Sequence, residues 1–266
     1  MSMSGYIAWA VICFGWCAAP AFASVPDDNT FLSYSGTATA PHSAKFLYNE
    51  RHILEYQNGR PAQRVVLYTC IDGKSFARKT VHYVDSLAPD FLLEDVSNGL
   101  REGVRSGSNG RAVFFRSGDA QRERSRVLGS ITGLVADAGF DEFVRANWQR
   151  LMTNQSLEMH FLIPSGLDNY RFQMQHLRSD HLDGVPVEVF RMELPGIWGW
   201  LLPETTVYYT ADDHVLLHYE GLSNLRDTSH SNIRADINFH LTDRTTTDRQ
   251  AYEDALTTPL APCNLE

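Results

Sequence analysis

The sequence predicts a mainly β protein, an antiparallel meander curved into a half-barrel or incomplete barrel with one central amphipathic helix and a short C-terminal helix. Three observations favour this fold class. Apolar and polar residues alternate along many short segments, turn dipeptides separate these segments, and one longer segment has helical spacing instead. About a dozen antiparallel strands joined as hairpins form a sheet that curls upon itself.

Strand periodicity is clearest in residues 232–240, NIRADINFH, where every second residue from Ile233 onward is apolar. Such alternation is typical of a strand with one buried and one solvated face. Residues 157–163 and 170–176 alternate in the same way. Further strands are predicted near residues 31–39, 44–57, 62–71, 75–84, 100–106, 111–117, 122–130, 185–194, 204–210 and 213–221.

Turn residues separate the predicted strands. Asn58-Gly59 and Asp72-Gly73 are strong signals for two-residue hairpin turns, because both positions tolerate a left-handed backbone. Weaker reversals are predicted at Asn109-Gly110, Asp183-Gly184 and Asp212-Asp213, and the polar residues 177–180 are interpreted as a hairpin loop.

Two segments are predicted to be helical. In residues 137–152 the apolar side chains, Phe143 and Trp148 among them, recur at helical spacing, and acidic residues occupy the first turn. A shorter helix is predicted to begin at Thr247, since Thr247 and Gln250 have the spacing of a capping box.

The first 23 residues contain no charged side chain and end in Ala21-Phe22-Ala23, a small-x-small site suited to signal peptidase. We therefore expect residues 1–23 to be a signal peptide cleaved near Ala23, and residues 24–266 to form a single β-rich domain. The alternative is an uncleaved membrane anchor, because residues 5–23 are just long enough to span a bilayer.

Charge and cysteine content narrow the class of protein. The net charge of −9 and the lack of a basic run argue against nucleic acid as a partner. Beyond the signal segment only Cys70 and Cys263 remain, and in an exported protein such a pair predicts one disulfide.

Motifs for catalysis, metal binding and cofactor binding are absent, so we assign no catalytic residue, no metal ligand and no cofactor. Ser223 with His218 or His230 could act as nucleophile and base only if folding brings them together. Arg78 and Lys79 are interpreted as part of a solvated hairpin, with a site for an anionic head group as the alternative. His176 and His181 are interpreted as surface histidines.

The most apolar connection lies at residues 194–203, LPGIWGWLLP, between two predicted strands. Connections are usually polar and exposed, so this composition indicates either a plug in the open end of the sheet or a lid over an apolar cavity. Our candidates for ligand-binding or lid residues are Ile197, Trp198, Trp200, Leu201 and Leu202 in this connection, together with Phe143 and Trp148 of the central helix.

This arrangement of many antiparallel strands, a midway amphipathic helix and a tethered C-terminal end resembles the LolA and LolB periplasmic lipoprotein carriers and related lipid-binding half-barrels of Gram-negative bacteria. The resemblance covers most of residues 24–266 in element order only. It implies a curved, incomplete barrel that holds acyl chains in an apolar concavity, and it transfers no binding residue.

Three functions remain open at this stage. The first is an exported periplasmic or envelope protein that binds a lipid or another hydrophobic small molecule in an apolar cavity without chemistry, since one helix cannot cover a sheet of this size. The second is an interaction or assembly protein of the cell envelope that docks a partner protein through residues 194–203. The third is a hydrolase of lipids or esters on the same scaffold. The oligomeric state and the ligand's identity are not indicated.

Overall fold

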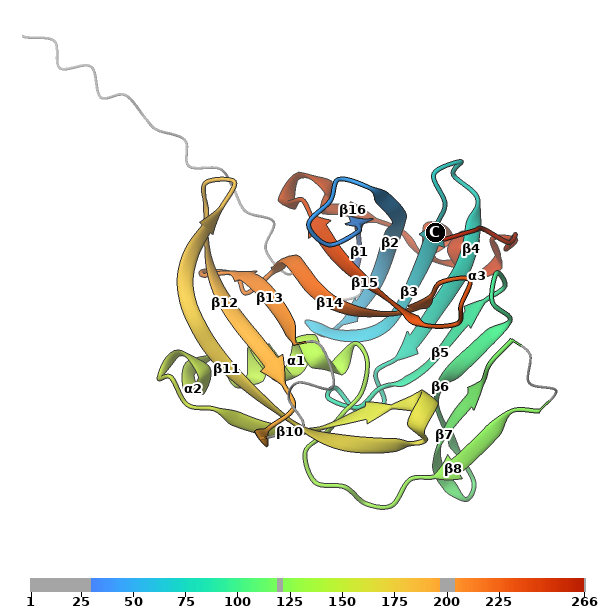
Figure 1. The fold of residues 1–266 in the computed structure, drawn as a ribbon, viewed down its shortest axis with the longest axis horizontal. Helices are drawn as coiled ribbons and strands as arrows, with labels where there is room; N and C mark the ends of the chain where they lie inside the picture. The colour runs from blue at the N-terminus through green and yellow to red at the C-terminus, as the bar shows by residue number, and fades with distance from the viewer. Residues whose placement is uncertain (1–29, 119–121, 197–203, 266) are drawn as a thin grey trace, which may run out of the picture.

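The computed structural model describes residues 30–118, 122–196 and 204–265 (Figure 1). Its strands are β1 (Thr30–Thr39), β2 (Phe46–Gln57), β3 (Arg60–Thr69), β4 (Ser75–His82), β5 (Asp90–Asp95), β6 (Leu100–Gly107), β7 (Gly110–Arg116), β8 (Arg124–Val127), β9 (Leu134–Val135), β10 (Leu157–Ile163), β11 (Asp168–Leu182), β12 (Val185–Glu193), β13 (Thr205–Thr210), β14 (Leu216–Arg226), β15 (Asn232–Phe239) and β16 (Thr245–Thr247). The helices are α1 (Gly139–Ala146), α2 (Trp148–Met152), α3 (Arg249–Thr257) and the 3-10 turns η1 (Pro164–Gly166) and η3 (Leu241–Asp243).

All the strands belong to one sheet. Its order is β8-β7-β6-β5-β4-β3-β2-β1-β15-β14-β13-β12-β11-β10-β9, with β16 paired to β1 off this path. Neighbours are antiparallel except β9 and β10, so the sheet consists of two meanders that meet where β1 pairs with β15. The predicted fold class, a mainly β incomplete barrel with few helices, is confirmed.

The two edges of the sheet, β8 and β9, are not joined by strand pairing among the described residues. Instead η1 packs against β6 and β7. Arg126 on β8 forms an ion pair with Asp168 at 2.6 Å, and Arg124 donates a hydrogen bond to the Ser165 carbonyl oxygen at 3.1 Å. Side chains and one turn therefore bridge the gap in the barrel.

The helices cover opposite faces of the sheet. Helices α1 and α2 pack on the inner face of β10 to β13, and Figure 1 shows α1 within the curve of the sheet. Helix α3 packs on the outer face of β1 to β3, where Tyr252 and Ala255 contact Phe31, Ile53 and Val65. Both faces of β2 and β3 are consequently buried.

The C-terminal tail is fastened to the sheet. Cys263 forms a disulfide with Cys70, as predicted, and its backbone N–H donates a hydrogen bond to the Ser97 hydroxyl at 2.8 Å. Leu265 is buried in the core formed by β1 to β6 and β15. In the chain-entropy description, closing a loop this long restricts the unfolded chain strongly and so favours the folded state.

Two details of the predicted helices are wrong. The segment 137–152 is broken at Asn147, whose side-chain amide donates to the Phe143 carbonyl oxygen at 2.9 Å and which leaves helical geometry. Helix α3 is capped by Asp248 instead of Thr247, because the Asp248 carboxylate accepts the Ala251 N–H at 2.9 Å.

The predicted hairpin loop at residues 177–180 is also wrong. Strand β11 continues through it to Leu182, with an irregularity between His176 and Arg178 that absorbs one extra residue. The chain reverses at Asp183-Gly184, both with positive φ, as the turn signal there predicts.

Candidate ligand-binding cavity

A cavity of about 1150 Å³, partly open to solvent, lies between the inner face of the sheet and α1. It forms because α1 and α2 fill only the part of the interior in front of β10 to β13. The volume exceeds the usual range of small-molecule pockets, about 300–1000 Å³, so a ligand with a long chain can be accommodated.

One wall of the cavity is apolar. It is contributed mainly by β10 to β12, α1 and the residues that flank η1, and further apolar side chains come from β14, β15 and from β5, which lies between β4 and β6. Its side chains are Phe91, Phe140, Phe161, Leu162, Ile163, Phe172, Met192, Leu194, Leu216, Ile237 and Phe239. Several of these aromatic rings meet edge to face, as Phe161 does with Phe140 and Phe172, which gives this wall a fixed shape.

The opposite wall carries ionisable groups on the inner face of β2, β3, β4 and β6. Glu50 and His52 lie on β2, Arg64 on β3, Lys79 on β4 and Glu102 on β6. Except for Lys79, each of these residues is less than a tenth exposed. A buried charge is expensive unless it is paired, so the partners of these groups define the chemistry of the cavity.

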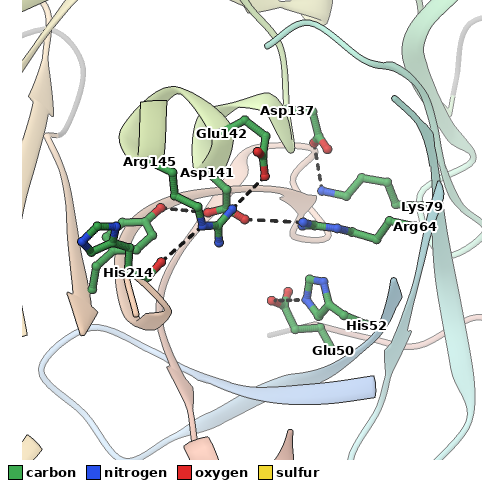
Figure 2. Close-up of polar contacts among 10 residues, drawn as sticks. Glu50, His52, Arg64, Lys79, Asp137, Asp141, Glu142, Arg145 and His214 are labelled. Atoms are coloured by element: carbon green, nitrogen blue, oxygen red, sulfur yellow. Dashed lines mark hydrogen bonds and ion pairs between the residues drawn. The ribbon is translucent and has the colours of Figure 1, made fainter. Parts of the chain in front are cut away.

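Helix α1 and the turn before it provide two of those partners (Figure 2). Asp137 accepts from the Lys79 ammonium at 2.8 Å and from the Asn224 amide at 3.1 Å. Asp141 accepts from the Tyr209 hydroxyl at 2.8 Å and lies 3.6 Å from Arg64. These contacts join α1 to β3, β4, β13 and β14 across the interior.

A close backbone approach lets α1 take this position. The Ala136 N–H donates to the Leu87 carbonyl oxygen at 2.9 Å, and a Cβ atom at Gly139 would overlap that same oxygen. Glycine is therefore required where the helix begins, since any side chain would push it away from the loop between β4 and β5.

The charge states of the buried groups follow from their surroundings. Burial opposes ionisation of Asp141, but Arg145, Arg64 and the Tyr209 hydroxyl outweigh it and hold the pKa of Asp141 below its ordinary value. Burial lowers the pKa of His52 in spite of Glu50, 2.9 Å away, so His52 is neutral at pH 7. Figure 2 shows the Glu50–His52 pair apart from the helix contacts.

Glu102 is a carboxyl group whose pKa is raised to near neutrality. Burial, with a contribution from Asp137, raises its pKa to about 7 against an ordinary value of 4.5, while Arg226 and Lys79 act in the opposite direction. Its side chain therefore gains a charge around physiological pH, inside the cavity.

This shift makes stability depend on pH. The folded state holds the Glu102 proton more tightly than the unfolded state does. The stabilisation that this proton gives the folded state is therefore complete below pH 4.5 and is lost as pH rises through 7. We expect the free energy of unfolding of the wild type to fall relative to that of Glu102→Gln by up to about 3 kcal/mol over this window. Urea titrations followed by circular dichroism at pH 4.5 and 8 measure it, and parallel pH profiles for both proteins would contradict it.

The candidate residues from the sequence have different positions. Phe143 and Trp148 are buried in the packing between α1, α2 and β10 to β13, and neither is among the described residues that line the cavity. Ile197, Trp198, Trp200, Leu201 and Leu202 lie outside the described residues. Leu194, which directly precedes this segment, does line the cavity.

Of the residues considered for hydrolysis, Ser223 lies at the cavity. Its hydroxyl accepts from the Tyr48 hydroxyl at 3.0 Å and from the Leu225 N–H at 3.1 Å. His218 contacts Asn238 and Glu220 instead, at 2.7 and 3.0 Å. Within the described chain, the hydrogen-bond partners of Ser223 thus include no histidine base.

Two interpretations of charged residues need correction. Lys79 is not solvated, because it faces the cavity with its side chain only 15% exposed. His176 is not an ordinary surface residue either, since it lies 2.7 Å from Glu188 with its side chain 11% exposed. Within the described part of the chain no three His, Cys, Asp or Glu side chains form a metal-ligand group.

The sequence did not single out the other charged residues that line the cavity, among them Glu50, His52, Arg64, Glu102, Asp137, Asp141, Arg145, Arg226 and Arg244. A signal was present in β2, where Tyr48, Glu50, His52, Leu54 and Tyr56 alternate with residues that include Ile53 and Leu47. Apolar residues on both faces show that both are buried, and a buried face with charges predicts partners across the interior.

No protein-family model matches the chain, and no curated protein matches it. Solved structures with a similar fold include a β-barrel-like protein of the domain of unknown function DUF1849 from Brucella abortus (TM-score 0.48, 7% identity, 85% of this chain and 100% of that one). Another is a domain described as outer membrane lipoprotein-sorting from Vibrio parahaemolyticus (TM-score 0.32, 9% identity, 86% of this chain and 89% of that one). A third is a LolA superfamily protein from Nitrosomonas europaea (TM-score 0.25, 10% identity, 85% of this chain and 89% of that one).

The last of these structures belongs to the superfamily that the element order of the sequence resembles. At these identities the likeness concerns the fold alone, and no functional residue or ligand is transferred from it. Helices long and apolar enough to cross a bilayer are not found among the residues that the structure describes.

Proposed function

We propose that the protein is exported to the periplasm or cell envelope and holds a lipid or another hydrophobic molecule in this cavity without chemical conversion. The observation that supports the proposal is the cavity of about 1150 Å³ with apolar side chains of β10 to β12 along one wall. A long apolar chain placed against this wall would be removed from water, at about 25 cal/mol for each Å² of apolar surface. The charged wall opposite would face the polar end of such a ligand.

Native mass spectrometry of protein purified from an envelope fraction tests the proposal directly, together with uptake of a fluorescent fatty acid. We expect a bound mass in the native spectrum and saturable uptake. A ligand-free mass combined with no uptake would contradict the proposal.

A cavity-filling variant sharpens this test. Met192 is half-buried on the apolar wall, so Met192→Trp is expected to occupy ligand space and to reduce uptake several-fold. The control is Ile71→Trp, which introduces the same side chain at a position that is 83% exposed and outside the cavity lining. Equal uptake by Met192→Trp and wild type would exclude the apolar wall as the binding surface.

A further inference from the structure

Arg64 and Arg244 line the cavity, and neither side chain has a hydrogen-bond acceptor among the described residues. The Arg64 side chain is 6% exposed, its shortest ion pair is the 3.6 Å approach to Asp141, and its guanidinium donates no hydrogen bond to a described residue. Its Nε is buried with no partner. Arg244, which follows η3, lies 4.5 Å over the Tyr34 ring and forms neither an ion pair nor a side-chain hydrogen bond with the described chain.

Both guanidiniums belong to one neighbourhood of the cavity. Tyr34, Tyr56 and Asp141 act electrostatically on Arg64 and on Arg244 alike, and both arginines line the cavity. Arg145 of α1 also acts on Arg244. Burial lowers the pKa of Arg244, yet a guanidinium keeps its charge at neutral pH.

The charges in this neighbourhood do not balance. Arg64, Arg145 and Arg244 face the carboxylates of Asp141 and Glu142, and Glu142 is engaged by Arg145 at 2.8 Å. Around these three arginines one positive charge is therefore in excess, and among the described residues only Glu50, beside the neutral His52, offsets it in the wider cavity. Lys79 and Asp137 neutralise each other beyond it, and Glu50 lies with His52 and acts on Lys79.

A guanidinium has five N–H donors, and a buried donor left unpaired, such as the Arg64 Nε, costs free energy. An anion with two or three oxygens would satisfy these donors, since the fork of an arginine matches carboxylate and phosphate geometry. We propose that the cavity binds an amphiphile with an anionic head group, a carboxylate or a phosphate, held between Arg64 and Arg244, with its apolar chain on the wall of β10 to β12. This inference rests on the proposed function and names its ligand class.

The test compares three ligands of equal chain length on the purified protein, namely palmitate, palmitoyl lysophosphatidate and the uncharged monopalmitoylglycerol, with inorganic phosphate alone as a fourth arm. Affinities are measured by displacement of a fluorescent acyl probe, and phosphate is followed by thermal shift. We expect the better of the two anionic amphiphiles to bind about tenfold or more tightly than the neutral one, as charged hydrogen bonds imply. Which anionic amphiphile binds more tightly identifies the head group.

Variants assign the effect to the two arginines. Arg64→Met and Arg244→Met are each expected to remove most of the preference for the anionic ligand, while binding of monopalmitoylglycerol stays within about twofold because its contacts are on the apolar wall. The thermal midpoint of the ligand-free protein is expected to fall only slightly in Arg244→Met, because the contact with the Tyr34 ring is lost but no protein hydrogen bond is. A purely structural arginine would lower the midpoint strongly and leave the preference intact.

Arg171 provides the matched control. It also lines the cavity, but its side chain is 61% exposed and lies 3.8 Å from Glu158, so Arg171→Met should keep the preference. Equal affinities for charged and neutral amphiphiles would overturn the inference and leave the proposed function standing. Binding of none of the amphiphiles would overturn both, and stabilisation by phosphate with no amphiphile binding would show a site for free anions instead.

Discussion

Replacing Asp137 by asparagine is expected to lower the free energy of unfolding by about 3–5 kcal/mol, because the buried Lys79 then loses its ion-pair partner within the described chain. The two groups lie 2.8 Å apart, with side chains 15% and 3% exposed. Burial opposes the charge on Lys79, and Asp137 provides the leading compensation that keeps its pKa above the ordinary value. Asparagine preserves the size and the left-handed backbone of this position, φ 44°.

A double-mutant cycle isolates the pair. Lys79→Met removes the other charge, and the variant with both changes should be less destabilised than the sum of the two single variants, since no unpaired charge remains. Urea unfolding followed by circular dichroism provides the four free energies. Strict additivity would show that the two groups contribute independently.

An exposed ion pair of similar geometry is available as a control. Lys74 and Asp72 lie 2.7 Å apart in the turn between β3 and β4, with side chains 65% and 49% exposed. Asp72→Asn should leave stability almost unchanged, because water replaces the partner of an exposed charge. The difference in the free energy of unfolding lost by Asp137→Asn and by Asp72→Asn measures the effect of burial on ion pairs of similar length.

The fold could be predicted because the physical signal for it is local. Alternation with period 2 and the Asn-Gly and Asp-Gly turns give most strands and their antiparallel order, and both depend on neighbouring residues only. Strand β5 was not predicted. In FLLED the outward Leu92 is apolar and the inward Asp95 is polar, so the sequence does not alternate although the burial does.

The apolar part of the cavity could be anticipated, but its charged part could not. Glu50, Arg64 and Lys79 occupy inward positions on three different strands, and a single strand read alone would place such residues toward water. Their partners Asp137 and Asp141 are on the segment that begins α1, far from them in sequence. Only the register of the folded sheet brings these groups together, so no local sequence pattern predicts that they pair.

The disulfide could be predicted from the sequence only in part. Cys70 and Cys263 are separated by 193 residues, and counting cysteines was enough to pair them once the signal segment was set aside. The path of the C-terminal tail over the sheet could not be predicted from the cysteine count. The tail that carries Cys263 crosses the ends of β4 and β5, where Ala261 N–H donates to the Ser75 carbonyl oxygen at 2.8 Å.

Truncation of Trp148 to alanine is the second change with a large expected effect, a loss of about 3–5 kcal/mol in the free energy of unfolding. The indole is 6% exposed and stacks on the His214 ring at 3.7 Å between centroids. It also meets Phe190 edge to face at 5.0 Å. Removing it leaves a void between α2 and the sheet that the rigid strands cannot close.

The same variant decides between the two roles open to Trp148. If the residue only packs α2 on the sheet, Trp148→Ala loses stability while the folded fraction takes up the acyl probe like the wild type. Tyr170→Ala is the counterpart, since Tyr170 lines the cavity and is 45% exposed, so its loss should reduce uptake with little change in stability. Circular dichroism and probe uptake at a temperature where both variants are folded separate these outcomes. Reduced uptake by Trp148→Ala at unchanged stability would instead assign Trp148 to the ligand.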